Sequence, residues 1–218
     1  MTANRRFWLQ WIAANALGEL VGLGAAAAVA IGLLLAVGEP KSLIAAAALA
    51  LAMIAAGTGE GVIVGWAQWR VLRQRLPAMP QGRWVRATAV GALVAWTFGM
   101  APSTLMSQQE TGGAPPWTPS ELQVMLLAAA MGAVLGPILG LPQWLALRRY
   151  VRRAHWWIWA NAAAWLAGMP LVFLGAGASP TGASPARIAL TIAATILAAG
   201  AVVGAIHGAA LLRLLKQD

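Results

Sequence analysis

Two carboxylates lie in the middle of long apolar stretches, where an ionised side chain is costly if those stretches cross a membrane. Counted from Arg6 and Arg70 at 1.5 Å per residue, Glu19 lies about 20 Å and Glu60 about 15 Å along a helix. An ionised carboxylate at the centre of a bilayer costs on the order of 3 kcal/mol. Such acids share a proton, bind a cation or contact another subunit, or else form a neutral, hydrogen-bonded structural pair.

Further polar side chains share the helix faces of these acids. Asn15 precedes Glu19 by one turn, and Gln68 follows Glu60 by two turns. If the two faces meet, these four side chains line a small polar pocket open toward the cytoplasm. Polar residues of later segments extend this pocket, namely Thr88, Gln143, Asn161 and His207. For each single amide, interhelical hydrogen bonding is the competing explanation.

Two local features leave alternatives open. His207 has Gly204 and Gly208 beside it, which leaves room for a haem or a chlorophyll-type pigment. It also stands where related segments carry Gln, which indicates a hydrogen-bonding role instead. The glycines of the segment 57–61, around the second acid, indicate either close helix packing or a locally unwound helix.

The composition is that of a membrane protein. Of the 218 residues, 60% are hydrophobic and only 10% are charged, whereas soluble domains carry about 25% charged residues. Six apolar segments exceed the roughly 20 residues needed to cross a bilayer. They run approximately over residues 7–37, 41–70, 84–104, 120–147, 155–176 and 185–212. We therefore expect an all-α, six-helix transmembrane bundle that forms a single integral membrane domain over residues 1–218.

The distribution of basic residues predicts the orientation. Of the 15 Lys and Arg residues, only Lys41 and Arg187 fall on the side of the segments around residues 38–42, 103–118 and 178–184. The positive-inside rule therefore places both termini in the cytoplasm. This topology also accounts for the net charge of +9 without nucleic-acid binding. The segment 103–118, rich in Pro and Gly, is expected to be an irregular outer loop.

Most tryptophans fall near the basic side. We expect an interfacial aromatic belt there, and ligand stacking is the alternative. The expected interface anchors are Trp11, Trp69, Trp84, Trp144 and Trp157.

An internal pattern predicts three two-helix repeats, over about residues 7–76, 84–150 and 155–216. Gly-x3-Gly-x2-Gln-Trp-x2-Leu-Arg occurs at 61–73 and 136–148, and a weaker copy begins at Gly200. This pattern resembles that of a loose group of uncharacterised bacterial multi-pass membrane proteins. The resemblance implies a bacterial cytoplasmic (inner) membrane and no particular activity.

No nucleophile elbow, P-loop, dinucleotide fingerprint or metal-ligand cluster occurs, so we expect no enzyme activity, no metal and no cofactor. The first hypothesis is an accessory, scaffold or partner-binding subunit, with the lipid bilayer and other membrane subunits or further copies of the chain as partners. The alternative is a small permease or a proton or cation conduit that uses Glu19 and Glu60. A minor alternative is a pigment- or quinone-binding subunit near His207.

Overall fold

The structure is a computed structural model that describes residues 2–106, 119–177 and 183–216, and within these ranges it contains six helices and no strand. All six helices are long and apolar enough to cross a membrane. This confirms the predicted all-α architecture with six spans, and the predicted bounds agree to within a few residues. The helices are α1 (Ala3–Val37), α2 (Leu43–Leu72), α3 (Gln81–Met106), α4 (Glu121–Leu147), α5 (Trp156–Gly177) and α6 (Pro185–Leu214).

Short polar residues define where several of the helices begin. Thr2, Ser42, Ser120 and Ser184 are N-caps whose side chains accept a hydrogen bond from a backbone N–H in the first turn. Ser120 forms a capping box with Gln123. The outer loop is predicted over residues 103–118. Residues 103–106 belong to α3, and residues 107–118 lie outside the described residues.

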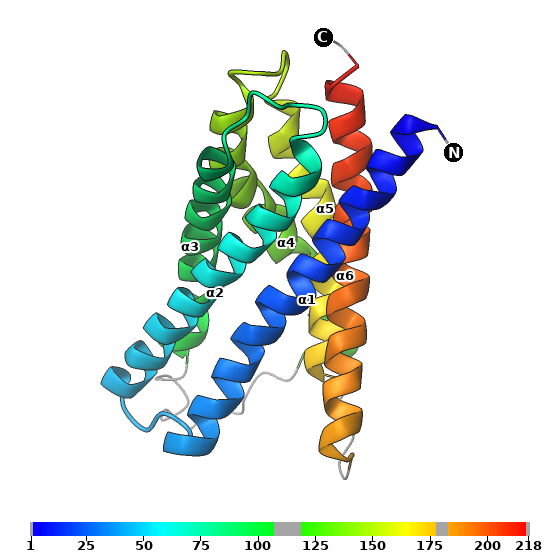
Figure 1. The fold of residues 1–218 in the computed structure, drawn as a ribbon. Coiled ribbons are helices and arrows are strands. Elements are labelled where there is room, and N and C mark those ends of the chain that lie inside the picture. Colours follow the sequence, from blue (N-terminus) through cyan, green and yellow to red (C-terminus); the bar gives the residue numbers. More distant parts are fainter. Residues whose placement is uncertain (1, 107–118, 178–182, 217–218) are drawn as a thin grey trace.

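The helices form a closed ring. Each helix packs against its neighbours in the chain, and α6 packs against α1 (Figure 1). Both termini lie at the same end of the bundle, which we call the terminal end. The connections 73–80 and 148–155 lie at this end too, because α2 and α4 run back toward it.

Glycines of the repeated sequence pattern bring neighbouring helices into close contact. A Cβ atom on Gly61 of α2 would lie 2.5 Å from the Cβ atom of Ala92 on α3. A Cβ atom on Gly136 of α4 would overlap the backbone of Asn161 on α5, and one on Gly200 of α6 would lie 2.8 Å from Cα of Ala16 on α1. Only glycine permits such backbone approaches, which are typical of membrane helix pairs.

The unwound alternative for the segment 57–61 is wrong. The helix α2 is continuous through this segment. Gly57 and Gly61 face α3 side chains at distances that exclude a Cβ atom, whereas Gly59 faces open space. Two of the three glycines therefore serve helix packing.

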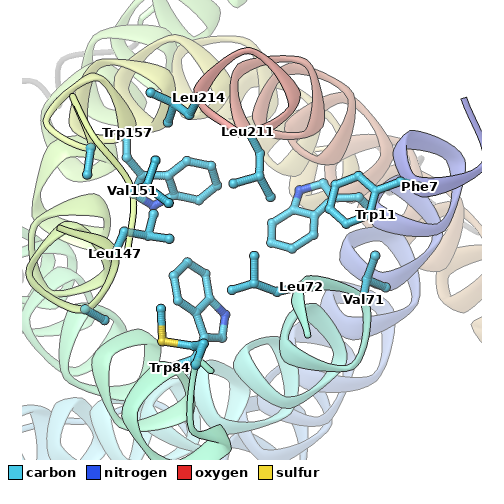
Figure 2. Packing of buried hydrophobic residues seen from close by; sticks show 13 residues of the cluster. Phe7, Trp11, Val71, Leu72, Trp84, Leu147, Val151, Trp157, Leu211 and Leu214 are labelled. Atoms are coloured by element: carbon cyan, nitrogen blue, oxygen red, sulfur yellow. The ribbon is translucent and has the colours of Figure 1, made fainter. Parts of the chain in front are cut away.

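A cluster of buried apolar side chains fills the ring at the terminal end (Figure 2). Its centre consists of side chains that point inward from all six helices. We call this set the terminal cluster; it comprises Phe7, Trp11, Val71, Leu72, Met79, Trp84, Ala146, Leu147, Val151, Ala154, Trp157, Leu211 and Leu214.

Three of the expected interface anchors belong to this cluster. Trp11, Trp84 and Trp157 are each 0% exposed, and the ring centroids of Trp157 lie 6.2 Å and 6.0 Å from those of the other two. Their assignment to an interfacial belt is therefore wrong. The indoles face the interior because the helices are rotated so that this face packs against the other helices rather than lipid.

Replacement of Gly136 by alanine tests the glycine contacts. The added methyl group overlaps the backbone of α5, so the Gly136→Ala variant should lose about 1–3 kcal/mol of unfolding free energy. Gly59→Ala is the matched control, because nothing lies within 4 Å of its Cβ position. The measurement is unfolding in mixed detergent micelles, and equal stability of the two variants would contradict the packing.

Candidate functional site

A cavity of about 410 Å³ lies inside the ring, beside the terminal cluster. All six helices contribute to its wall. On α3 the lining residues run from Thr88 to Met100, which corresponds to about 18 Å along the helix axis. The volume falls in the range of small-molecule sites, about 300–1,000 Å³.

The layer of the cavity nearest the terminal cluster is polar, and Gln68 organises its first part. Its Nε2 atom donates a hydrogen bond of 2.9 Å to Oδ1 of Asn15 on α1. Its Oε1 atom accepts one of 3.2 Å from the indole N–H of Trp84 on α3. The side chain of Gln68 therefore connects the two helices that flank its own.

Gln143 on α4 occupies the corresponding place one third of the way around the ring. Its Nε2 atom donates to Oγ1 of Thr88 at 3.0 Å and to Oε1 of Gln68 at 3.3 Å. Its Oε1 atom accepts from the indole N–H of Trp157 at 2.9 Å. Buried polar groups that are fully paired in this way rigidify the interior.

The third part of this layer, between α5, α6 and α1, lacks these hydrogen bonds. His207 is 2% exposed, and neither of its ring nitrogens has a hydrogen-bond partner among the described residues. The indole N–H of Trp11 has none in the same ranges. The imidazole ring instead lies 4.9 Å, centroid to centroid, from Trp157. Because imidazole is shorter than the side chain of Gln, it does not connect its neighbours as the two amides do.

The two acids lie further from the terminal cluster, and both face the cavity. Glu19 on α1 and Glu60 on α2 line the same cavity, and Glu60 packs against α1 at Gly22, one turn from Glu19. The indole N–H of Trp96 donates to Oε2 of Glu60 at 2.8 Å. Glu19 is 3% exposed, and its Oε2 atom has no partner among the described residues.

Two glycines make this arrangement possible. A Cβ atom on Gly22 of α1 would lie 2.9 Å from Cγ and 3.0 Å from Cα of Glu60, so glycine lets the second acid approach α1. A Cβ atom on Gly57 of α2 would overlap the indole ring of Trp96. The sequence analysis missed Trp96 and Gly22. The available signal for Trp96 was its position as a single tryptophan midway along an apolar segment, far from the basic residues.

The rest of the cavity wall is mostly apolar. No Lys or Arg occurs among the described residues that line it. Its apolar side chains come mainly from α3, α4 and α5, and include Met100, Met131, Leu135, Trp165, Met169 and Phe173. The cavity thus joins a polar layer and an acid pair to an apolar body.

The structure brings together every residue proposed for the polar pocket. All seven line one cavity, and Thr88 joins them: Asn15, Glu19, Glu60, Gln68, Gln143, Asn161 and His207. The predicted opening of the pocket toward the ends of the chain is wrong, because the terminal cluster closes that side. Trp69 and Trp144 are half-buried beneath the guanidinium groups of Arg73 and Arg148, and their anchoring role stays a prediction.

The hydrogen-bonded layer predicts a difference among three equally buried indoles. Trp157→Phe leaves Oε1 of Gln143 without its indole donor, and Trp84→Phe removes one of the two hydrogen bonds to Oε1 of Gln68, whereas Trp11→Phe removes no hydrogen bond. Because an unpaired buried group costs about 1–3 kcal/mol, Trp157→Phe should be destabilised more than Trp11→Phe by this amount, and Trp84→Phe should fall between the two. The measurement is unfolding in mixed micelles, and equal losses for all three would contradict the network.

Comparison with protein-family models, curated proteins and solved structures finds no match to this chain. A function therefore has to be argued from the cavity and its residues.

Proposed function

We propose that the protein is a small permease that binds its solute in the central cavity, with Glu19 and Glu60 as the groups that bind a cation or exchange protons. The observation that carries this proposal is that the two acids, from different helices, line one cavity whose wall all six helices form, with Glu60 packed against α1 one turn from Glu19. Carboxyl groups within the membrane are costly, and they mark ion, proton and substrate pathways when they face an internal cavity.

The excess of basic residues at the terminal end supports a cytoplasmic location for that end, and the proposal places the chain in a bacterial inner membrane. The terminal cluster is then the inner seal of the permease. The cavity lies on the outer side of this seal, and the solute reaches the acids from outside. Separation of the indoles of Trp11, Trp84 and Trp157 opens the path to the cytoplasm.

The site offers less support to the other hypotheses. The scaffold hypothesis relied on glycine faces that receive helices of other subunits. In the structure, Gly61 and Gly136 instead contact helices of the same chain. A pigment on His207 needs the space beside Gly204 and Gly208, but a Cβ atom on these glycines would lie 2.9 Å from Cβ of Asn15 and 2.7 Å from Cδ1 of Trp8. The scaffold hypothesis stays a prediction.

Thiol accessibility tests this proposal without knowledge of the solute. The chain has no cysteine, so a single introduced thiol is the only target. Ala95 lines the cavity and is 6% exposed. The Ala95→Cys variant should react with a small, charged methanethiosulfonate reagent from outside in intact cells and from the cytoplasmic side in inverted vesicles, because a permease exposes its cavity to each side in turn.

The matched control is Leu93→Cys, two residues away on the same helix and 42% exposed. Its side chain faces the bilayer, so its thiol should stay unmodified from both sides. Modification of Ala95→Cys from one side only would contradict a permease and favour a static binding or scaffold protein.

A further inference from the structure

The acid pair has bonding capacity that the chain itself leaves unused. Oε2 of Glu60 accepts a hydrogen bond from the Trp96 indole, whereas Oε2 of Glu19 is buried and has no partner within the described ranges. No Lys or Arg lines the described wall of the cavity. Two adjacent carboxyl groups that share one proton carry a single negative charge. A ligand that complements this pair brings one positive charge and several N–H donors.

The size and the ligand set of the cavity argue against a bare metal ion. Among the described residues no group of three or more His, Cys, Asp and Glu side chains is placed to hold a metal. Calcium requires about six to eight oxygen ligands, whereas the pair supplies two carboxyl groups. A cavity of about 410 Å³ is also far larger than an ion needs, since it lies in the range that holds small organic molecules.

The wall that faces the acids suits an apolar or aromatic body. In the ring, α4 lies across from α1, and α5 lies across from α2. The facing wall carries the thioethers of Met131 and Met169 and the indole of Trp165. Methionine side chains adapt to irregular ligand shapes, and indole rings stack on flat ligands and attract cations.

We infer that the cavity binds a monovalent organic cation, namely a protonated amine on an apolar, preferably aromatic, body. The ammonium group lies between Glu19 and Glu60, and the body packs against the side chains of α4 and α5. This inference names the solute class of the proposed permease and rests on that proposal for transport. Binding itself requires only the cavity.

The test compares ligands with the same body and different heads. The probes are 1-naphthylmethylamine, which is protonated at pH 7, and neutral 1-naphthylmethanol. Calorimetric titration uses the full chain in detergent micelles, with empty micelles subtracted. The amine should bind at least about tenfold more tightly than the alcohol, because only the amine carries a charge for the acids. Equal affinities, or no binding of the amine, would overturn the inference.

Variants assign the effect to the acid pair. The double variant Glu19→Gln, Glu60→Gln should lose at least about tenfold in amine affinity and keep the affinity for the alcohol. Glu39→Gln is the matched control, because Glu39 lies outside the six helices and does not line the cavity. Unchanged amine affinity in the double variant would overturn the assignment.

A second measurement uses the wild-type chain, in case the double variant does not fold. Dicyclohexylcarbodiimide is an apolar reagent that adds to protonated carboxyl groups within membranes and forms a stable N-acylurea. Mass spectrometry of peptides should locate this adduct on Glu19 or Glu60. The naphthyl amine should protect against its formation and the alcohol should not. Equal protection by both probes, or by neither, would contradict an amine bound between the acids.

The outcomes separate this inference from the proposed function. If the thiol at position 95 reacts from both sides but the amine does not bind, the permease stands and the solute class is wrong. If the amine binds at the acids but the thiol reacts from one side only, the amine site stands and the permease is wrong.

Discussion

Close approach of α6 to α1 is the contact on which the rest of the structure depends. Gly204 faces Cβ of Asn15 and Cα of Ile12, both 2.9 Å from where its own Cβ atom would lie, and this contact joins the last helix to the first. Without this contact, the six helices would form an open row in which the first and the last do not meet. With it they enclose a space, and the side chains on the inner faces meet. Small residues provide this closeness because helices in lipid associate mainly through packing.

The enclosed space is divided by chemistry. At the terminal end, large apolar side chains point into it, and Trp11, Leu72 and Leu147 are 0% exposed. Next to them, Gln68 and Gln143 accept hydrogen bonds from the indole N–H groups of Trp84 and Trp157, which would otherwise be unsatisfied. This pairing matters because an unpaired polar group is especially costly in a medium of low dielectric constant. Beyond this layer the ring is wide enough to leave the cavity, and the acids lie there.

The glutamine–indole hydrogen bond recurs around the ring except beside α1, the helix that carries Glu19. Gln68 and Gln143 each pair with a flanking indole, whereas His207 does not. The helix α1, which flanks His207, also carries Glu19. The unpaired polar side-chain atoms of the described interior therefore all belong to α1 and α6. Proteins tend to break their own packing regularities at functional sites.

Much of this arrangement was predictable from the sequence, because a helix of 3.6 residues per turn brings residues four apart onto one face. The spacing of Asn15 and Glu19, and of Glu60 and Gln68, placed each pair on a common face, and apolar length alone identified six spans. Rotation of a helix about its axis was harder to predict. Tryptophans beside arginines are typical of an interfacial belt, yet Trp84 and Trp157 pack inside. Their inward orientation depends on contacts between distant helices.

The environment of the acids could not be predicted from any single segment, because it depends on contacts between helices. Trp96 reaches Glu60 only because Gly57 leaves space for its ring, and these three residues lie on two different helices. A pattern of glycines indicates close packing but does not name the partner. The direction in which the pocket opens was mistaken for the same reason, since the closing side chains come from all six helices.

Disulfide formation between α1 and α6 tests the central claim, closure of the ring, most directly. In the cysteine-free chain, the Asn15→Cys, Gly204→Cys pair should oxidise to a disulfide within the membrane after the two helices move apart by about 1 Å, because 2.9 Å between the Cβ positions is shorter than the roughly 3.8 Å of a disulfide. The disulfide is detected as resistance to alkylation and a mass lower by two hydrogens. The pair Leu17→Cys, Gly204→Cys should remain reduced, because Leu17 is 57% exposed on the outer face of α1. Failure of the first pair to oxidise, or equal oxidation of both, would contradict a closed ring.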